Sequence, residues 1–220
     1  MRAEREVRFI DLSHTVEHGM VTYKGLPAPV IIDHMSREQS RAKYSAGTEF
    51  HIGKIEMVAN TGTYLDSPFH RYADGRDLSE IGLESVADLE GIVVHAKAQA
   101  TTASTFEGMQ LAGKAVLIHT GWDVHWRTEQ YSSGHPYLTE DAAQFLVDSN
   151  AALVGIDSFN IDSIKDGRRP VHSILLRANI PIVEHLCGLG QLPDKGFRFF
   201  AVPVKVKHFG SFPVRAFAIL

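Results

Sequence analysis

The segment Asn60-Thr61-Gly62-Thr63-Tyr64-Leu65-Asp66-Ser67-Pro68-Phe69-His70 is the densest run of turn-forming and chemically active residues in the chain. Gly62 permits a tight turn after the apolar run that precedes it, and Pro68 stiffens the chain between an acid and a histidine. If residues 64–66 are extended, the side chains of Tyr64 and Asp66 face the same way. An acid and a histidine held on one turn are groups that metal-assisted hydrolysis uses, although such pairs also occur by chance in loops.

Short apolar runs rich in strand-forming residues surround this segment and alternate with turn signals. We expect strands over 9–12, 30–32, 50–59, 91–95, 115–119, 152–156, 181–183, 197–206 and 214–220. Gly53 lies inside the third run, where the alternation changes face, and this indicates a bulge. Helices are expected after Thr139, over 171–178 and over 83–89. Because strands outnumber helices and alternate with them irregularly, the sequence predicts a mixed α/β class.

The composition is that of an ordinary globular protein, with 44% hydrophobic and 22% charged residues in a chain of 220. The sequence shows no repeat and no linker, so we expect one domain over residues 1–220. Its one cysteine excludes an internal disulfide, and its net charge of −4 gives no basic excess for binding nucleic acid. No apolar run reaches membrane-spanning length and the first residues are charged. We therefore expect a soluble, cytoplasmic protein with neither a nucleic-acid nor a membrane partner.

Residues 60–70 resemble the H-x-G-T-H-x-D-x-P-x-H signature of the cyclase family of metal-dependent hydrolases, which includes bacterial kynurenine formamidases and isatin hydrolases. The similarity extends over nearly the whole chain, through residues 9–14, 119–123, 135–139, 155–158 and the segments around His172 and Glu184. The resemblance implies the swivelling β/β/α fold of that family. It also implies a homo-oligomer, either a dimer or a tetramer.

The resemblance assigns roles to four residues by position. Asp66 matches the aspartate that bridges metals in the family, and His172 and Glu184 match its distal metal ligands. His70 matches the histidine that the family uses as a proton shuttle. The resemblance thus implies one divalent metal, with zinc as the first choice and manganese as the second, held by Asp66, His172 and Glu184.

Two positions depart from the family pattern, because Asn60 and Tyr64 stand where the family has metal-binding histidines. An amide oxygen is a poorer zinc ligand than an imidazole, and a phenol must lose its proton to bind a metal well. We therefore expect Asn60 and Tyr64 to contact the substrate and not the metal. His51 and Glu56 precede the motif and could replace a missing ligand.

The implied activity is hydrolysis of a carbon–nitrogen bond in a small amide, such as an N-formyl arylamine, a cyclic imide or a lactam. A divalent metal would activate the water, and His70 would pass the proton to the leaving nitrogen. Two other classes remain open. The departures at Asn60 and Tyr64 favour a metal-free small-molecule binding protein on the same scaffold, and the same groups could serve a metal-dependent cyclase or dehydratase acting on a hydroxy acid.

Each residue of the expected site also has a purely structural explanation. Asp66 could cap the turn that follows it, because aspartate is a common turn former. His70 could be an ordinary surface histidine, His172 could merely open its helix, and Glu184 could be an exposed strand residue. Asp162 is expected to satisfy loop backbone groups.

Overall fold

The computed structural model describes residues 7–220 and contains a nine-stranded sheet in the order β1-β13-β11-β5-β7-β9-β10-β4-β12. The strands are β1 (Phe9–Asp11), β4 (Tyr64–Asp66), β5 (Leu89–His95), β7 (Ala115–His119), β9 (Leu153–Ile156), β10 (Ile182–Glu184), β11 (Lys195–Phe200), β12 (Ser211–Pro213) and β13 (Phe217–Ile219). The central strands β5, β7, β9 and β10 are parallel to their neighbours in that group, and the flanking pairs are antiparallel.

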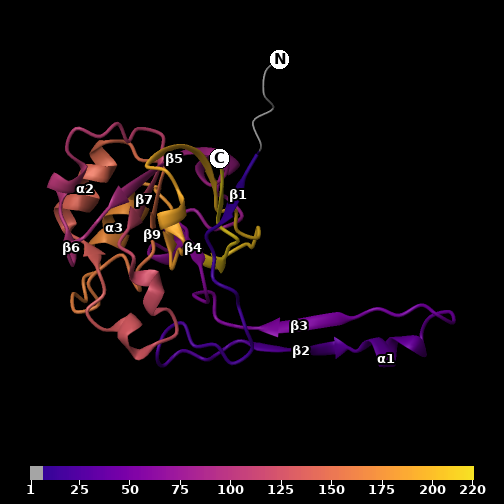
Figure 1. Ribbon diagram of the computed structural model, residues 1–220. Coiled ribbons are helices and arrows are strands. Elements are labelled where there is room, and N and C mark those ends of the chain that lie inside the picture. Colours follow the sequence, from indigo (N-terminus) through magenta and orange to yellow (C-terminus); the bar gives the residue numbers. More distant parts are fainter. Residues whose placement is uncertain (1–6) are drawn as a thin grey trace, which may run out of the picture.

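The sheet curls until its two edges meet. β12 lies at one edge and β13 is second from the other, yet only residues 214–216 connect them. A link of that length spans roughly 15 Å at most, so the edges must be neighbours. The Val214 N–H donates to the Thr63 carbonyl at 2.9 Å, and the Leu12 N–H donates to the Ala216 carbonyl at 2.9 Å. These contacts bring the C-terminal strands beside β1 and β4 (Figure 1).

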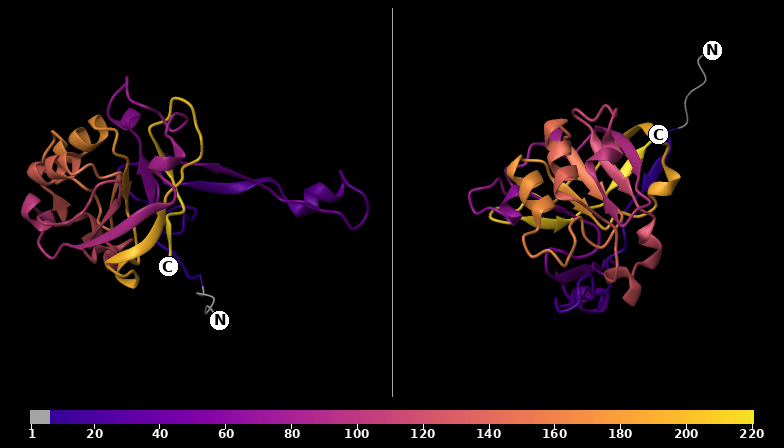
Figure 2. Two further views of the ribbon diagram at one scale, coloured as in Figure 1. Left: turned by 90° about the horizontal axis from the view of Figure 1, so that it is seen from above. Right: turned by 90° about the vertical axis from the view of Figure 1, so that its left-hand side faces the viewer.

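Alternation along the central strands creates a core on each face of the sheet. One face is covered by α2 (Glu140–Asp148) and α3 (Pro170–Arg177), against which pack Val94, Val116, Ile118, Val154 and Ile182. The inside of the curl is filled by the alternate residues of the same strands, among which are Val93, Leu117, Leu153 and Val183. Figures 1 and 2 show the two helices on one side of the sheet. The predicted mixed α/β class is confirmed.

Residues 30–56 form an arm that extends away from the sheet (Figures 1 and 2). The arm consists of the antiparallel strands β2 (Val30–Met35) and β3 (Ile52–Glu56) and the short helix α1 (Arg37–Arg41) between them. The register shifts between Asp33, which is opposite Gly53, and Met35, which confirms the irregularity expected at that glycine. Large apolar side chains on the arm are exposed, among them Ile32, Phe50, Ile52 and Ile55.

Several predicted boundaries are wrong. The expected helix over 83–89 is only a 3-10 turn, Leu83–Ser85, because Leu89 already belongs to β5 and pairs with Phe199. The expected strand over 197–206 ends at Phe200, and that over 214–220 is confined to β13, Phe217–Ile219. The expected strand over 50–59 is confined to Ile52–Glu56.

The remaining elements are short. β6 (Ala100–Thr101) and β8 (Tyr137–Leu138) form a small parallel ribbon, and single 3-10 turns join the larger elements. Within residues 7–220, every helix is too short or too polar to cross a bilayer.

Candidate active site

The register of three strands places four polar side chains on one face of the sheet. β4 lies between β10 and β12, with Tyr64 opposite Glu184 and Asp66 opposite Ser211. Because cross-strand partners share a face, these four side chains point to the same side, while Leu65 points into the inner core. All four are buried. The expected common orientation of Tyr64 and Asp66 is therefore confirmed.

The turns on either side of β4 position His70. Gly62 has φ +65°, the left-handed conformation that its predicted turn requires. Pro68 opens the 3-10 turn Pro68–His70, which carries His70 back toward the strand. Gly210 lies so close that a Cβ atom there would be 2.5 Å from the His70 backbone nitrogen. The close approach of the two loops thus depends on a glycine that no local pattern singles out.

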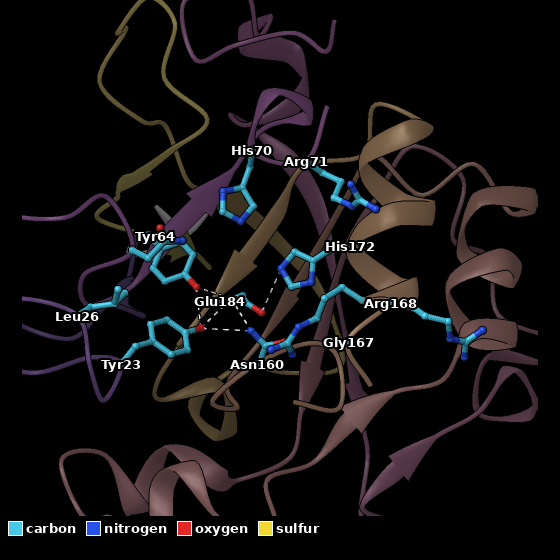
Figure 3. Close-up of a pocket in the computed structure, with 12 residues that line it drawn as sticks. Tyr23, Leu26, Tyr64, His70, Arg71, Asn160, Gly167, Arg168, His172 and Glu184 are labelled. Atoms are coloured by element: carbon cyan, nitrogen blue, oxygen red, sulfur yellow. Dashed lines mark hydrogen bonds and ion pairs between the residues drawn. The ribbon is translucent and has the colours of Figure 1, made fainter. Parts of the chain in front are cut away.

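Asp162 fixes the orientation of His172 at the start of α3. Its carboxylate accepts the backbone N–H groups of Val171 at 2.8 Å and His172 at 3.0 Å, as expected of a residue that satisfies backbone. It also accepts the Nδ1–H of His172 at 2.6 Å. The Nε2 atom of His172 consequently faces Asp66 Oδ2 at 3.6 Å and Glu184 Oε1 at 3.7 Å, as Figure 3 shows for Glu184.

The acids around His172 give this region an excess of negative charge. Burial lowers the pKa of His172, but the carboxylates of Glu184, Asp162 and Asp66 outweigh it and raise the pKa to about 10. Asp66 Oδ2 is buried and has no hydrogen-bond partner within residues 7–220. A buried carboxylate oxygen without a donor is costly unless a cation is close to it.

Each of the two carboxylates is spaced from His172 Nε2 as two ligands of one divalent cation would be. Two ligand atoms about 2.0–2.2 Å from one tetrahedral ion lie roughly 3.4 Å apart, close to the observed 3.6 and 3.7 Å separations. Oxygen and imidazole nitrogen are ligands that zinc and manganese both accept. Asp66, His172 and Glu184 are thus brought together. Within residues 7–220, the group of three whose ligand atoms all lie within 4.8 Å of one another is Asp66, His172 and His70, an overlapping set that Glu184 approaches through His172.

Ser211 connects His70 to Asp66. The Ser211 hydroxyl donates to Asp66 Oδ1 and lies 2.8 Å from His70 Nδ1. A hydroxyl has one proton, so when Asp66 is ionised the serine donates to Asp66 and accepts the Nδ1–H of His70. The Nε2 atom of neutral His70 is then left free to accept a proton.

Tyrosine and amide groups surround the other oxygen of Glu184. Glu184 Oε2 accepts the hydroxyl of Tyr64, the hydroxyl of Tyr23 at 3.1 Å and the side-chain amide of Asn160 at 3.4 Å. Its Oε1 accepts the Ile161 N–H at 2.7 Å. Burial, with the charge of Glu184 as the next cause, raises the pKa of both Tyr23 and Tyr64 well above 10. Both tyrosines therefore stay protonated and act as hydrogen-bond donors.

A cavity of about 300 Å³ opens above these groups, and its lining includes Asn60, Tyr64, His70, Arg169, His172 and Glu184 (Figure 3). This is the small end of the range for ligand pockets. The alternative of an exposed strand residue is wrong for Glu184, which is fully buried. His51 and Glu56 are on the arm, where they pair with Asp33 and Lys54, so they supply no ligand to the cavity of their own chain.

Sequence reasoning missed three participants, namely Tyr23, Asn160 and Ser211. Tyr23 and Asn160 reach Glu184 from loops that are distant in sequence. Ser211 reaches Asp66 only through the pairing of β12 with β4. Local patterns contain no signal for such contacts.

Comparison with known proteins relates this chain to a family. The sequence profile of the family described as "Putative cyclase" matches residues 10–163. Kynurenine formamidase from Bacillus cereus is 26% identical over 209 residues, which cover 94% of this chain and 95% of that protein.

Two solved structures share the fold. An isatin hydrolase bound to the product analogue thioisatinate matches with a TM-score of 0.80 at 22% identity, over 98% of this chain and 93% of that one. A structure described as a potential metal-dependent hydrolase with cyclase activity matches with a TM-score of 0.79 at 22% identity, over 97% and 98%. These likenesses confirm the expected fold. Since the profile match spans most of the sequence, the chain belongs to the cyclase family.

Proposed function

We propose that this protein is a metal-dependent hydrolase that cleaves the carbon–nitrogen bond of a small linear or cyclic amide, such as an N-formyl arylamine, an imide or a lactam. The observation that carries the proposal is the buried, unpartnered Asp66 Oδ2 beside His172 Nε2, which also faces Glu184. Kynurenine formamidase and isatin hydrolase, by their names, act on substrates of this kind.

Asp66, His172 and Glu184 would hold one divalent ion, zinc or else manganese. When bound, such an ion lowers the pKa of water and stabilises negative charge that develops on a carbonyl oxygen. Asp162 holds the His172 ring through Nδ1 and so keeps Nε2 aimed at the ion site. The hydroxyls of Tyr23 and Tyr64 hold Glu184 Oε2 and leave Oε1 facing His172.

His70 carries the proton in this proposal. Its Nε2 accepts a proton from the attacking water and delivers it to the leaving nitrogen, while Nδ1–H stays bonded to Ser211. Asn60 and Tyr64 line the same cavity and would contact the substrate. Tyr64, Asp66 and Glu184 can act together because the register of β4 and β10 places their side chains on one face of the sheet.

The test combines metal analysis with a substrate panel. Purified protein should contain about one divalent ion per chain by mass spectrometry, and it should hydrolyse at least one formyl arylamide, imide or lactam. A chelator should abolish the activity, and added zinc or manganese should restore it. If the protein binds neither zinc nor manganese, yet calorimetry shows that it binds compounds of the panel, it is a metal-free binding protein and not a hydrolase.

The same panel separates the remaining alternative. A metal-dependent cyclase or dehydratase would leave all amides intact and convert hydroxy acids to cyclic or dehydrated products. In that case the metal analysis would succeed while the amide assay failed. Product identification by mass spectrometry distinguishes the two reactions, because hydrolysis adds one water and dehydration removes one.

We also propose that the protein is a homo-oligomer in which a second copy covers the arm. A lone two-stranded ribbon is marginally stable in water, and this one exposes Ile32, Ile52 and Ile55. Residues 30–56 contain four acidic and four Lys or Arg side chains, so the charges of the arm balance and do not oppose its packing against another copy of itself.

Sedimentation measurements test this proposal. The wild-type protein should be a dimer or a tetramer, and Ile55→Asp should shift it toward the monomer. Val124→Asp is the matched control, because Val124 is also exposed but lies outside the arm. A wild-type monomer, or an Ile55→Asp protein that assembles normally, would contradict it.

A further inference from the structure

Three arginines line the cavity beside the proposed ion site, and they differ in how their charges are used (Figure 3 labels two of them, Arg71 and Arg168). Arg168 is paired with Asp166 at 2.8 Å and with Glu140 at 3.4 Å. Arg71 is exposed and donates to the Ser173 hydroxyl at 3.1 Å. The charge of Arg168 is therefore already balanced, and Arg71 reaches into solvent.

Like Arg71, Arg169 has no carboxylate partner within residues 7–220, but whereas Arg71 is exposed, Arg169 is half-buried. Its Nη1 donates to Asn160 Oδ1 at 3.3 Å and to the Ser163 carbonyl at 3.4 Å, both long contacts with neutral groups. Within residues 7–220 no carboxylate oxygen lies in ion-pair range of its guanidinium. A guanidinium has five donors, so Arg169 keeps most of its hydrogen-bonding capacity free at the cavity.

The backbone at Arg169 is strained. It has φ 51° and ψ 59°, the left-handed conformation, and it directly precedes Pro170. Few residues other than glycine adopt this conformation, and a proline disfavours helical conformations in the residue before it. Such strain persists where the rest of the structure holds it, and it concentrates at functional sites. Seven non-glycine residues among 7–220 have a positive φ, so at Arg169 the strain supports a role for the side chain only together with its unpaired guanidinium at the cavity.

Asn160 links Arg169 to the ion site. Its Oδ1 accepts from Arg169, and its amide nitrogen donates to Glu184 Oε2 at 3.4 Å. One side chain thus spans from the arginine to a residue of the proposed ligand set. A cavity of about 300 Å³ then presents an unpaired guanidinium beside the place where an amide carbonyl would be attacked.

We propose that Arg169 binds a carboxylate of the substrate, so that the substrate is a small amide that also carries a free carboxylate. This inference rests on the proposed amide hydrolysis. A planar guanidinium matches a carboxylate in a two-point hydrogen bond, which gives both affinity and orientation. N-acylated amino acids, N-acylated aminobenzoates and half-amides of dicarboxylic acids belong to this class.

The test compares two substrates that differ only in charge, N-formyl-2-aminobenzoate and its methyl ester. Wild-type protein should prefer the acid. Arg169→Gln should raise KM for the acid about 10- to 100-fold, since a charged hydrogen-bonded pair is lost, and should leave kcat and the ester nearly unchanged. Arg168→Gln is the matched control and should change neither substrate more than about 2-fold, because its exposed ion pairs contribute little. Equal KM for acid and ester in the wild type would overturn the inference while leaving amide hydrolysis intact.

A binding measurement keeps the inference testable if no amide is cleaved. Calorimetry with 2-aminobenzoate should show binding to wild-type and Arg168→Gln protein, and a loss of at least about 10-fold in affinity for Arg169→Gln. If the glutamine variant folds poorly, Arg169→Gly removes the side chain while suiting the left-handed backbone. Unchanged affinity in a folded Arg169 variant would contradict the proposal.

Discussion

Two groups of side chains at the cavity and beneath its lining, which we call the charged wall and the neutral wall, differ in electrostatic character; Asp66, Asp162 and His185 belong to these groups without lining the cavity itself. The charged wall consists of Asp66, Asp162, His172 and Glu184, whose acids raise the pKa of the imidazole to about 10. The neutral wall consists of Asn60, Tyr23, Tyr64 and His185. There burial raises the pKa of both tyrosines well above 10 and lowers that of His185 well below 6.5. All four of its side chains therefore remain uncharged near neutral pH.

The difference teaches what each wall can do. The charged wall contains more negative than positive charge, including the unpartnered Asp66 Oδ2, and is suited to hold a cation. The neutral wall has no acid of its own, and its tyrosines serve Glu184 as donors. Two of its residues, Asn60 and Tyr64, stand where the signature that residues 60–70 resemble has histidines. A single ion on the charged side is the simplest expectation.

The largest expected effect comes from His172→Ala on the charged wall. Loss of this ligand should remove the metal and lower turnover roughly 1000-fold or more, because a metal contributes several kcal/mol to the transition state. Tyr64→Phe on the neutral wall is the control, and it should weaken metal binding no more than about 10- to 100-fold. Metal content and turnover check both. Equal losses in the two variants would erase the distinction between the walls.

The next effect concerns His70, which stands outside both walls. His70→Ala should lower turnover about 100-fold, the usual scale for a general acid–base residue, and should retain its metal. Because His70 belongs to the overlapping set with Asp66 and His172, simultaneous loss of metal and activity would identify it as a ligand instead. Metal analysis of the purified variant decides between the two outcomes.

A smaller effect is expected from replacing two residues of the neutral wall with histidines. Asn60→His combined with Tyr64→His should create a second ion position, with Asp66 available to bridge, and raise the metal content from about one to about two per chain. The replacement of a buried phenol should cost about 1–3 kcal/mol of stability. Each single change should leave the second ion short of a ligand. No increase in a folded double variant would mean that the neutral wall has been rebuilt for substrate contact alone.

The smallest expected effect is a pH dependence of stability that comes from His14. His14 stacks on Trp126, and burial, opposed by Asp123, lowers its pKa to about 4. Between pH 6.5 and pH 4, His14 binds a proton in the unfolded chain but remains neutral in the folded protein. The free energy of unfolding should therefore be highest above pH 6.5 and fall by about 1–3 kcal/mol toward pH 4.

His14→Phe keeps the stacked ring but cannot titrate, so its stability should change less over this window. Urea unfolding at several pH values measures the difference between the two proteins. A parallel decline in both would assign the pH dependence to other groups.

Local sequence predicted the parts of the fold that depend on neighbouring residues. The helix after Thr139 exists as Glu140–Asp148, and the apolar run at 115–119 is a strand with those same limits. The predicted strand boundaries were wrong where the sheet curls, because residues 214–216 leave the strand pairing and cross from β12 at one edge to β13 near the other. Nothing within a few residues of Val214 indicates which edge the chain must join.

The sequence by itself determined the turn at Gly62, the orientation of Tyr64 and Asp66, and the family resemblance that singled out His70, His172 and Glu184. These follow from backbone conformations and motif spacing, which are local properties. Only the tertiary structure decided that Ser211 meets Asp66 across 145 residues and that Tyr64 donates to Glu184 across 120. Those contacts depend on the register of β4 against β12 and β10, which is set by the packing of the whole sheet and not by any one segment.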